Sequence, residues 1–354
     1  MRAFPDWIRL VVGVALVISI AGSLHAQPIK TGDGTVLRIV QANGIKMRIA
    51  EQGSGPLVVL LHGWPESWYS WRYQLPALAK AGYHVVAPDM RGFGGTEAPP
   101  AVDDYTIQKL TGDVVGLLDA LHEKTAVVIG HDWGATVAWY SVLMHPERFR
   151  AIVAMSVPLR PRTTESPMTV ARHTYADRFY YQLYFQQPGV AEKELDGNPR
   201  EFLSRIYASP STPRTPPQVT DPAASAGGWT VRIGKPSETV PWLSAADLDY
   251  YVAEFQRTGF RGGLNYYRNI DRNWETTEQL AQTRISVPAL FIAGEKDLVI
   301  SGATRSQLLA MMGPRVEDLR VDLYPNSGHW VQQERADEVN GAIATFLSSL
   351  PARP

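Results

Sequence analysis

The sequence predicts an α/β fold in which helices cover both faces of a mostly parallel β-sheet and a helical cap is inserted between two parts of the sheet. Short runs of almost entirely apolar residues alternate with helical patterns, as expected when strands are buried on both sides. A segment rich in Tyr, Phe and Pro interrupts this alternation between residues 159 and 272. The chain has 354 residues, 45% of them hydrophobic, which is enough for one sizeable core with an insertion.

Residues 1–26 have the features of a signal peptide. Arg2 and Arg9 precede an uninterrupted apolar run that starts at Leu10, and small residues follow that run. The run is shorter than the roughly 20 residues that a membrane-spanning helix needs. We therefore expect cleavage close to Ala26 and export to the periplasm or the medium, with no stable membrane anchor.

The composition excludes several classes of partner and site. Acidic and basic residues nearly cancel, with a formal net charge of -1, and no stretch concentrates Lys and Arg as binding to nucleic acid requires. The chain contains no cysteine, so disulfides, thiolate metal sites and cysteine nucleophiles are excluded. We expect a small apolar molecule as the partner, and neither a metal nor a cofactor.

The strands can be assigned in chain order. Two strands joined at Asn43 and Gly44, the strongest short hairpin signal, form an antiparallel edge at the start of the domain. The parallel strands follow as short apolar runs at residues 56–63, 83–89, 125–132, 149–158, 287–297 and 319–330. The core therefore has a first part at residues 27–158 and a second part at residues 273–354.

Residues 159–272 are expected to form the cap. One helix in this segment starts after its N-cap Ser244, carries Asp247 three residues further on, and ends at Gly259. Residues 208–228 contain many prolines and little periodicity, which predicts a surface loop. The sequence leaves open whether this loop forms a contact in a homodimer or acts as a lid.

The motif Gly-His-Asp-Trp-Gly at residues 130–134 lies between an apolar strand and a helical pattern. A strand-to-helix turn of the form Gly-x-nucleophile-x-Gly lifts its central side chain out of the sheet and points a helix N-terminus at it. Asp132 occupies the central position, where most hydrolases carry serine. An aspartate in front of a helix is often an N-cap alone, but the two flanking glycines favour a nucleophile.

A carboxylate at this position implies a particular chemistry. A serine that attacks an alkyl carbon would form an inert ether, whereas Asp132 would form an ester that can be hydrolysed at its own carboxyl carbon. The sequence therefore predicts substitution at a saturated carbon that bears a leaving group, followed by hydrolysis of the ester.

A base for this hydrolysis follows from the order of residues along the chain. Asp132, Asp297 and His329 reproduce the order nucleophile, acid, histidine, and the last two follow strands at the edge where ligands bind in open α/β sheets. We expect His329 to activate water while Asp297 orients the imidazole. We assign His62 and His131, which lie in neighbouring motifs, to packing and loop hydrogen bonds.

Two backbone N–H groups are expected to stabilise the tetrahedral intermediate of the hydrolysis. Trp133 directly follows the nucleophile, and Trp64 lies in the loop after the run at residues 56–63. The rings of both residues are also interpretable as core aromatics. The two interpretations are compatible, because the backbone can donate while the ring walls an apolar pocket.

Together, these motifs resemble the epoxide hydrolases of the α/β-hydrolase superfamily, and the chain is similar to the hydrolase domain of the soluble vertebrate enzymes. The resemblance runs through nearly the whole chain after the leader and implies the α/β-hydrolase fold. It rests on five segments, which are HGWPESWYSWRYQLPALAKAGYHVVAPDMRGFGGTEAPP, GHDWG, YQLYFQQPGVAEKEL, GFRGGLNYYRN and SGHW.

The resemblance also implies a role for two tyrosines of the cap. One tyrosine from YQLYFQ and one from LNYYRN would donate hydrogen bonds to the epoxide oxygen, and the matching residues are Tyr181 and Tyr267. Spacing alone does not distinguish these two from Tyr180, Tyr184 and Tyr266, whose simpler interpretation is packing within the cap.

The motif HGWP contains both a match and a departure. The vertebrate enzymes resemble HGFP at this motif, so Trp64 takes the place of a phenylalanine. Its larger ring would narrow the pocket and change substrate preference. The resemblance further implies a cis peptide before Pro65, which would aim the Trp64 N–H inward.

Three functions are compatible with these residues. The leading hypothesis is an epoxide hydrolase that converts a small apolar epoxide and water to a vicinal diol through a covalent Asp132 ester, without metal or cofactor. The first alternative is a haloalkane dehalogenase that uses the same aspartate. The second is a ligand-binding protein that has lost turnover, but such a protein would lack a catalytic member, and none is missing.

Overall fold

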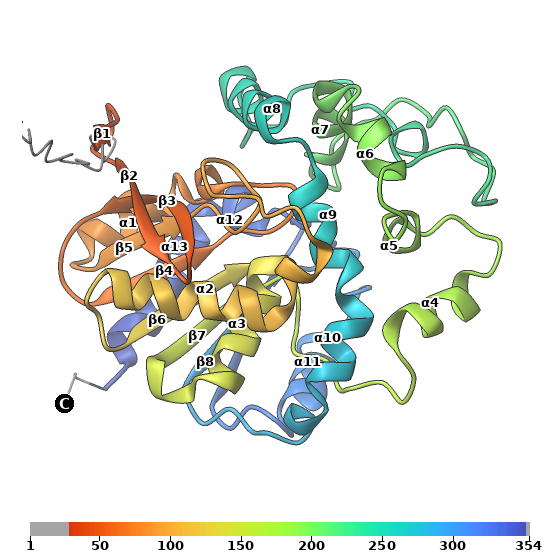
Figure 1. The fold of residues 1–354 in the computed structure, drawn as a ribbon. Helices are drawn as coiled ribbons and strands as arrows, with labels where there is room; N and C mark the ends of the chain where they lie inside the picture. Colours follow the sequence, from red (N-terminus) through yellow and green to blue (C-terminus); the bar gives the residue numbers. More distant parts are fainter. Residues whose placement is uncertain (1–27, 352–354) are drawn as a thin grey trace, which may run out of the picture.

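The computed structural model describes residues 28–351, so the expected signal peptide lies outside the described residues. The described residues form a nine-stranded sheet in the order β1-β2-β3-β5-β4-β6-β7-β8-β9, surrounded by helices (Figure 1). The strands are β1 (Ile29–Lys30), β2 (Val36–Ala42), β3 (Ile45–Gln52), β4 (Leu57–Leu61), β5 (His84–Pro88), β6 (Ala126–His131), β7 (Phe149–Met155), β8 (Ala289–Gly294) and β9 (Leu319–Tyr324).

The N-terminal edge of the sheet is antiparallel. β2 and β3 are joined by Asn43 and Gly44, whose φ values of 48° and 79° are the left-handed values that a tight hairpin turn requires. β3 also pairs antiparallel with β5, whereas every pairing from β5 across to β9 is parallel. The predicted hairpin, antiparallel edge and parallel sheet are therefore confirmed.

Both faces of the sheet are covered by helices. In β4, Leu57, Val59 and Leu61 enter one hydrophobic cluster, whereas Val58 and Leu60 enter another. Successive side chains of a strand point to opposite faces of the sheet, and both faces are covered here, so every residue of this strand must be apolar. The first cluster includes residues of α2 (Ile107–Ala120), α3 (Trp133–Met144) and α11 (Arg305–Met312), and the second includes residues of α1 (Gln74–Lys80), α12 (Val331–Glu334) and α13 (Ala336–Ser349).

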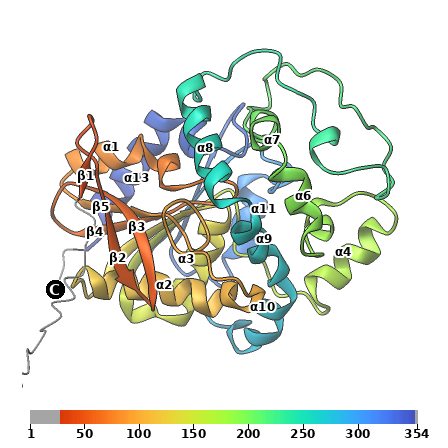
Figure 2. The ribbon, with the colours of Figure 1, turned by 45° about the horizontal axis from the view of Figure 1, so that its top comes forward.

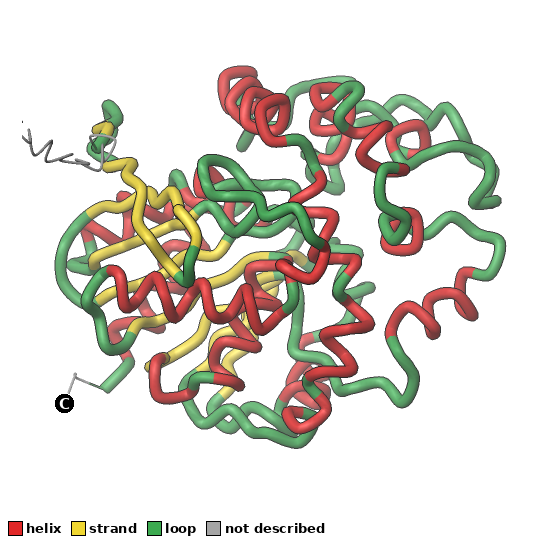
Figure 3. Tube along the Cα trace, viewed as in Figure 1, coloured by secondary structure: helices red, strands yellow, loops and turns green. Residues whose placement is uncertain are grey.

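Between β7 and β8 the described chain contains helices and loops, which form a cap beside the sheet (Figure 3). The α-helices of this segment are α4 (Pro167–Tyr175), α5 (Tyr181–Tyr184), α6 (Val190–Leu195), α7 (Pro199–Ile206), α8 (Ala245–Thr258), α9 (Arg261–Arg268) and α10 (Ile270–Thr276). The same segment contains the short 3-10 helices η4 (Thr230–Arg232) and η5 (Glu278–Leu280), whereas η1 (Trp68–Trp71), η2 (Val102–Tyr105) and η3 (Pro146–Arg148) precede it in the core.

Two predictions within the cap are confirmed. Helix α8 begins after Ser244, whose hydroxyl accepts a hydrogen bond from the Asp247 N–H while the Asp247 carboxylate accepts one from the Ser244 N–H. It ends at Gly259, which has a φ of 66°. The Pro-rich residues 208–228 form a loop, and the connection from α7 to α8 follows the outer edge of the cap (Figure 2).

Residues 28–351 include no helix with both the length and the apolar composition that crossing a membrane requires. Within the same residues, His, Asp and Glu side chains form no group of three or more that could hold a metal ion.

Candidate active site

Asp132 lies in a sharp turn between β6 and α3. It is the N-cap of α3 and has a φ of 53° and a ψ of -118°, a conformation that residues other than glycine rarely adopt. The two flanking glycines allow this turn to pack closely. A Cβ atom at Gly130 would lie 2.1 Å from the Gly134 carbonyl oxygen, and one at Gly134 would lie 1.9 Å from the Leu61 carbonyl oxygen. The motif therefore presents a carboxylate in a strained turn that larger residues at either glycine would break.

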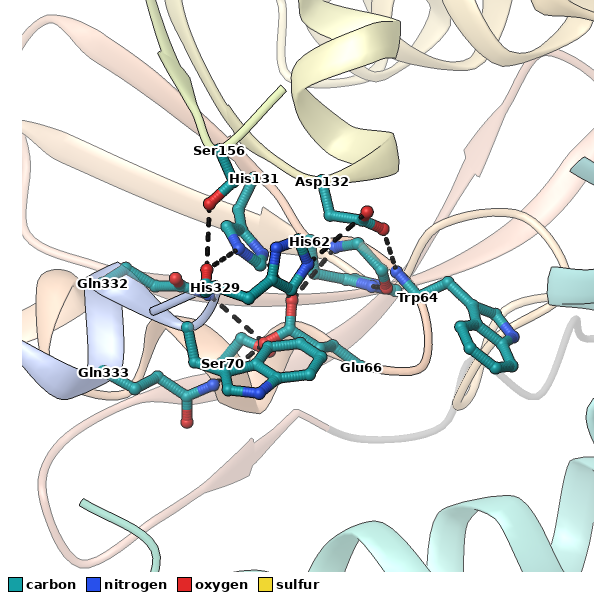
Figure 4. Close-up of polar contacts among 12 residues, drawn as sticks. His62, Trp64, Glu66, Ser70, His131, Asp132, Ser156, His329, Gln332 and Gln333 are labelled. Atoms are coloured by element: carbon teal, nitrogen blue, oxygen red, sulfur yellow. Dashed lines mark hydrogen bonds and ion pairs between the residues drawn. The ribbon is translucent and has the colours of Figure 1, made fainter. Parts of the chain in front are cut away.

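A backbone N–H group donates to the Asp132 carboxylate, and the first N–H of a helix lies next to it. The Trp64 N–H donates a hydrogen bond of 2.8 Å to its Oδ1 atom, and the peptide bond between Trp64 and Pro65 is cis (Figure 4). Trp133 is the first residue of α3, so its N–H is one of the four that a helix leaves without an intrahelical acceptor. Both residues expected to supply backbone donors thus lie beside Asp132.

His329 lies between the two aspartates. Its Nε2 atom is 3.6 Å from Asp132 Oδ2, and its Nδ1 atom is 3.1 and 3.2 Å from the two carboxylate oxygens of Asp297. Asp297 is buried and also accepts a hydrogen bond of 2.9 Å from the Val299 N–H, which fixes its orientation. The carboxyl ends of β6, β8 and β9 thus bring together three side chains that are far apart in the sequence.

The electrostatics of this group favour an ion pair. Burial alone would raise the pKa of Asp297, but the positive charge and hydrogen bond of His329 outweigh it and lower that pKa. Burial would lower the pKa of His329, but Asp297 and Asp132 together raise it well above its ordinary value. The two carboxylates therefore favour the protonated form of the imidazole.

Tyr181 and Tyr267 approach this group from the cap. Tyr181 begins α5 and Tyr267 lies on α9, and their ring centroids are 5.8 Å apart in an edge-on arrangement. Burial is the main cause that raises the pKa of each phenol, and the negative charge of Asp132 raises it further. The ring of Tyr267 also lies 5.2 Å from the ring of Trp133.

The neighbouring tyrosines are engaged elsewhere. The Tyr266 hydroxyl donates a hydrogen bond of 2.9 Å to the Arg91 carbonyl oxygen, and the Tyr184 hydroxyl donates one of 2.6 Å to Glu194. Tyr180 stacks on Tyr175 with a centroid distance of 4.0 Å. The structure thus separates five tyrosines that spacing alone could not.

Comparisons with known proteins agree with this geometry. Residues 56–336 match the model of the alpha/beta hydrolase fold family. Epoxide hydrolase A of Mycobacterium tuberculosis is 44% identical over 321 residues, which cover 89% of this chain and 98% of that protein. The crystal structure of epoxide hydrolase A from Mycobacterium thermoresistibile superimposes with a TM-score of 0.83 at 44% identity, covering 90% of this chain and all of that chain. The chain belongs to the epoxide hydrolase family. 

A vertebrate member of the epoxide hydrolase family is also similar to the chain. Bifunctional epoxide hydrolase 2 of Rattus norvegicus is 39% identical over 308 residues, which cover 86% of this chain but only 54% of the rat protein. The family and the α/β-hydrolase fold that the motifs imply are therefore confirmed.

A buried pair that the sequence analysis missed lies beneath the histidine of this epoxide hydrolase family member. His131 places Nε2 2.7 Å from the His329 carbonyl oxygen and Nδ1 2.9 Å from Glu66, and both His131 and Glu66 are buried (Figure 4). Because a carbonyl oxygen can only accept, His131 donates through Nε2. The sequence predicts loop hydrogen bonds for His131, and its contact with the His329 backbone is such a bond.

Glu66 connects this pair to the loop that holds the nucleophile. One carboxylate oxygen accepts a hydrogen bond of 3.3 Å from the Gly63 N–H, and the other accepts one of 2.9 Å from Gln333 and one of 3.2 Å from Gln332. Burial would raise the pKa of Glu66, but the charge and hydrogen bond of His131 and a hydrogen bond from Ser70 lower it. The only signal in the sequence was a charged residue within the otherwise apolar stretch HGWPESW.

His62 has a separate task in the same loop. Its Nε2 atom accepts a hydrogen bond of 2.9 Å from the Met90 N–H, so Nδ1 carries the proton and donates to the Gly63 carbonyl oxygen at 2.8 Å. Burial lowers the pKa of His62, which keeps this ring neutral. The ring thus joins the loop after β4 to the loop after β5, as its assignment to loop hydrogen bonds expects.

The ring of Trp64 fills the space between this loop and the cap. It stacks on Trp229 with a centroid distance of 5.8 Å and an interplanar angle of 10°, and it lies edge-on to Tyr267 at 5.7 Å. A Cβ atom at Gly263 would lie 2.4 Å from the Trp64 ring, so helix α9 can approach only because it carries glycine there. The large ring is therefore part of the contact between core and cap.

Proposed function

We propose that the protein adds water to an epoxide and releases a vicinal diol, in two steps that pass through a covalent ester of Asp132. The observation that carries the proposal is a carboxylate at the strand-to-helix turn, faced by a histidine at 3.6 Å and by two phenols from the cap. Among these side chains, only the carboxylate can attack an alkyl carbon and form a bond that water can cleave afterwards.

In the first step, an Asp132 carboxylate oxygen attacks one ring carbon of the epoxide. The bond from that carbon to the ring oxygen breaks, and the oxygen keeps the electron pair while it remains attached to the second carbon. Tyr181 and Tyr267 donate hydrogen bonds to this oxygen, and one of them transfers its proton. Their raised pKa values keep both phenols protonated at neutral pH, so each can act as a donor.

In the second step, His329 takes a proton from water, and the resulting hydroxide attacks the carboxyl carbon of the Asp132 ester. The N–H groups of Trp64 and Trp133 stabilise the oxyanion that forms. The intermediate then collapses: the bond from the carboxyl carbon to the alkoxide oxygen breaks, and His329 gives a proton to that oxygen. The new carboxyl group passes its proton back to His329, so the diol leaves and the Asp132 carboxylate is restored. Esterification removes the charge of Asp132, which is one cause of the raised pKa of His329. The ring can then give up the proton that restores the phenol left ionised by the first step, and only after that is it available as a base.

The two phenols favour this reaction over dehalogenation. An epoxide oxygen stays attached to the product and must acquire a proton, whereas a departing halide needs none. A haloalkane dehalogenase would need neither the partly buried Tyr181 nor the buried Tyr267. A protein that only binds its ligand would not need His329 held by Asp297.

A single turnover in heavy-oxygen water tests the covalent step. The oxygen added to the first diol should come from Asp132, and the heavy isotope should appear in the peptide that contains this residue, as read by mass spectrometry. Heavy oxygen in the diol alone would show direct attack of water and would contradict the ester.

We also infer that residues 1–26 direct export and are removed. The support is the order of basic, apolar and small residues in this segment. N-terminal sequencing of the protein recovered from the periplasm or medium should give a start close to Gln27. An intact Met1 in a membrane fraction would replace export by anchoring.

A further inference from the structure

The hydroxyl oxygen of Tyr181 accepts a hydrogen bond from the residue that follows it. Tyr181 and Gln182 are the first two residues of α5, and the Gln182 amide nitrogen donates to the Tyr181 hydroxyl oxygen at 3.0 Å. Both residues are partly buried. Among the described residues, the Gln182 amide nitrogen has no other hydrogen-bond acceptor. The contact therefore belongs to one phenol, which the proposed function uses as a proton donor.

The direction of this bond distinguishes Tyr181 from neighbouring tyrosines of the cap. The Tyr184 hydroxyl donates its only proton to Glu194. The Tyr266 hydroxyl donates its proton to the Arg91 carbonyl oxygen. Tyr181 instead accepts a hydrogen bond, so its proton stays free for a substrate oxygen, which can only accept.

A second glutamine holds this arrangement in place. The Gln186 side-chain amide donates a hydrogen bond of 2.9 Å to the Gln182 carbonyl oxygen and one of 3.0 Å to the Tyr267 carbonyl oxygen. The amide nitrogen carries two hydrogens, so it can make both bonds at once. It thus ties the backbone of α5, which carries Tyr181, to that of α9, which carries Tyr267. Gln182 and its phenol therefore keep a fixed place relative to the second phenol.

The surroundings of Tyr181 disfavour the negative charge that proton transfer would leave on its oxygen. Its ring stacks on Trp229 with a centroid distance of 4.6 Å, and apolar contacts of this kind stabilise the neutral phenol. Burial raises the pKa of Tyr181, whereas the hydrogen bond from Gln182 lowers it. Burial likewise raises the pKa of Tyr267, and a hydrogen bond from the Trp133 side chain lowers it. Each phenol thus has a donor of its own, and the donor for Tyr181 is Gln182.

We propose that Gln182 is a positioning residue for ring opening and that it acts through Tyr181. When Tyr181 transfers its proton, its O–H bond breaks, the electron pair stays on the phenol oxygen, and the alkoxide of the opened ring becomes a hydroxyl group. The Gln182 N–H stabilises the charge on the phenol oxygen, because a hydrogen bond to an ionised acceptor is roughly twice as strong as one to a neutral acceptor. The bond strengthens as the proton leaves, so it lowers the barrier to ring opening. The inference rests on the proposed function, which requires a leaving oxygen that gains a proton.

The rate at which the Asp132 ester forms from an aryl epoxide tests this role, measured by rapid quench and mass spectrometry. Gln182→Met keeps a side chain of similar size but removes the donor, and it should slow ester formation about tenfold. Gln182→Glu has the same shape but offers an acceptor that would take the Tyr181 proton, so it should slow ester formation at least as much. A role in packing alone would leave this variant close to the parent. Gln256→Met, at an exposed residue of α8, is the matched control and should stay within about twofold of the parent.

Double variants show whether Gln182 acts through Tyr181. Tyr181→Phe removes the oxygen to which Gln182 donates, so adding Gln182→Met should change the rate of ester formation by less than about twofold. In a Tyr267→Phe background, the same addition should keep its full effect of about tenfold. Circular dichroism checks that every variant is folded.

Three results would contradict the inference, and they separate it from the proposed function. A rate equal to that of the parent in Gln182→Met or in Gln182→Glu, while Tyr181→Phe is slow, would overturn the role of Gln182 alone. The same loss of rate from Gln182→Met in the Tyr181→Phe background as in the parent would show that Gln182 acts by another route. No loss of rate in Tyr181→Phe itself would overturn both the inference and the proton-donor role of Tyr181.

Discussion

The core and the cap hold their active-site residues by different means. In the core, Asp132 accepts a hydrogen bond from Trp64, and His329 is held by Asp297 on one side and by His131 beneath its backbone. These residues carry charge or contact a charged group, and directional polar contacts fix each of them. Such contacts resist displacement, because breaking one would leave a buried charge without a partner.

In the cap, the two phenols lie among aromatic rings. Tyr181 stacks on Trp229 with a centroid distance of 4.6 Å, and Tyr267 lies 5.0 Å from the ring of Phe185. Apolar surroundings disfavour the ionised form of a phenol, so they keep each proton donor neutral. The charged groups of the core thus need polar contacts, whereas the phenols of the cap stay protonated because their surroundings are apolar.

The largest expected effect comes from removing both phenol hydroxyls that the cap contributes to the site. The double variant Tyr181→Phe and Tyr267→Phe should nearly abolish ring opening, because each lost hydroxyl costs on the order of 2 to 4 kcal/mol of transition-state stabilisation. Turnover of an aryl epoxide measures the effect, and circular dichroism checks the fold. Tyr184→Phe is the control, since its hydroxyl contacts Glu194. Near-normal epoxide turnover in the double variant, or faster cleavage of chloroalkanes than of any epoxide by the parent, would favour the dehalogenase.

Removing the core's base should stop a different step. His329→Gln should still let Asp132 open the ring, but hydrolysis of the ester should slow by roughly 10² to 10⁴, the usual contribution of a general base. We expect a stoichiometric burst of substrate consumption and a protein whose mass rises by one substrate. His173→Gln, at an exposed histidine, should behave as the parent. Loss of the burst with the fold intact would show that His329 acts before ester hydrolysis.

A third substitution tests whether polar contacts stabilise the core as argued. Glu66→Gln removes the buried charge opposite His131 and should lower the free energy of unfolding by on the order of 3 kcal/mol. Urea denaturation measures the change. Glu165→Gln, at an exposed position, should change stability by less than about 0.5 kcal/mol. A neutral effect of Glu66→Gln would mean that the buried charge contributes nothing to the stability of the core.

The smallest expected effect is on how the free energy of unfolding depends on pH, through Glu51 of strand β3 in the antiparallel part of the sheet. Burial would raise the pKa of Glu51, but His84 and Arg38 lower it to about 2. A carboxylate whose pKa is lower in the folded state stabilises the fold above its unfolded pKa of about 4.5, and this contribution is lost as the pH falls from about 4.5 to about 2. Because the group is partly exposed, we expect on the order of 1 kcal/mol. Glu51→Gln should flatten the stability profile in that window, and an unchanged profile would contradict the assignment.

Local features of the sequence were sufficient for much of the fold. Asn43 and Gly44 predicted a hairpin because few residues adopt left-handed φ values at two successive positions. Ser244 and Asp247 predicted the start of a helix because both contacts of the capping box join residues three apart. The glycines around Asp132 predicted the nucleophile turn for the same reason, since the close approach occurs within one short motif.

What the sequence by itself determined is therefore whatever depends on neighbours along the chain, which includes the strands, the helix caps and the sharp turn that presents Asp132. The tertiary structure alone decided which contacts form between distant segments. It placed the Tyr266 hydroxyl on the Arg91 backbone and left Tyr267 close to Asp132, and it linked Glu66 to the His329 backbone through His131. The physical reason is that adjacent residues of a helix point in different directions, and only the packing of α9 against the core determines which of them reaches the site.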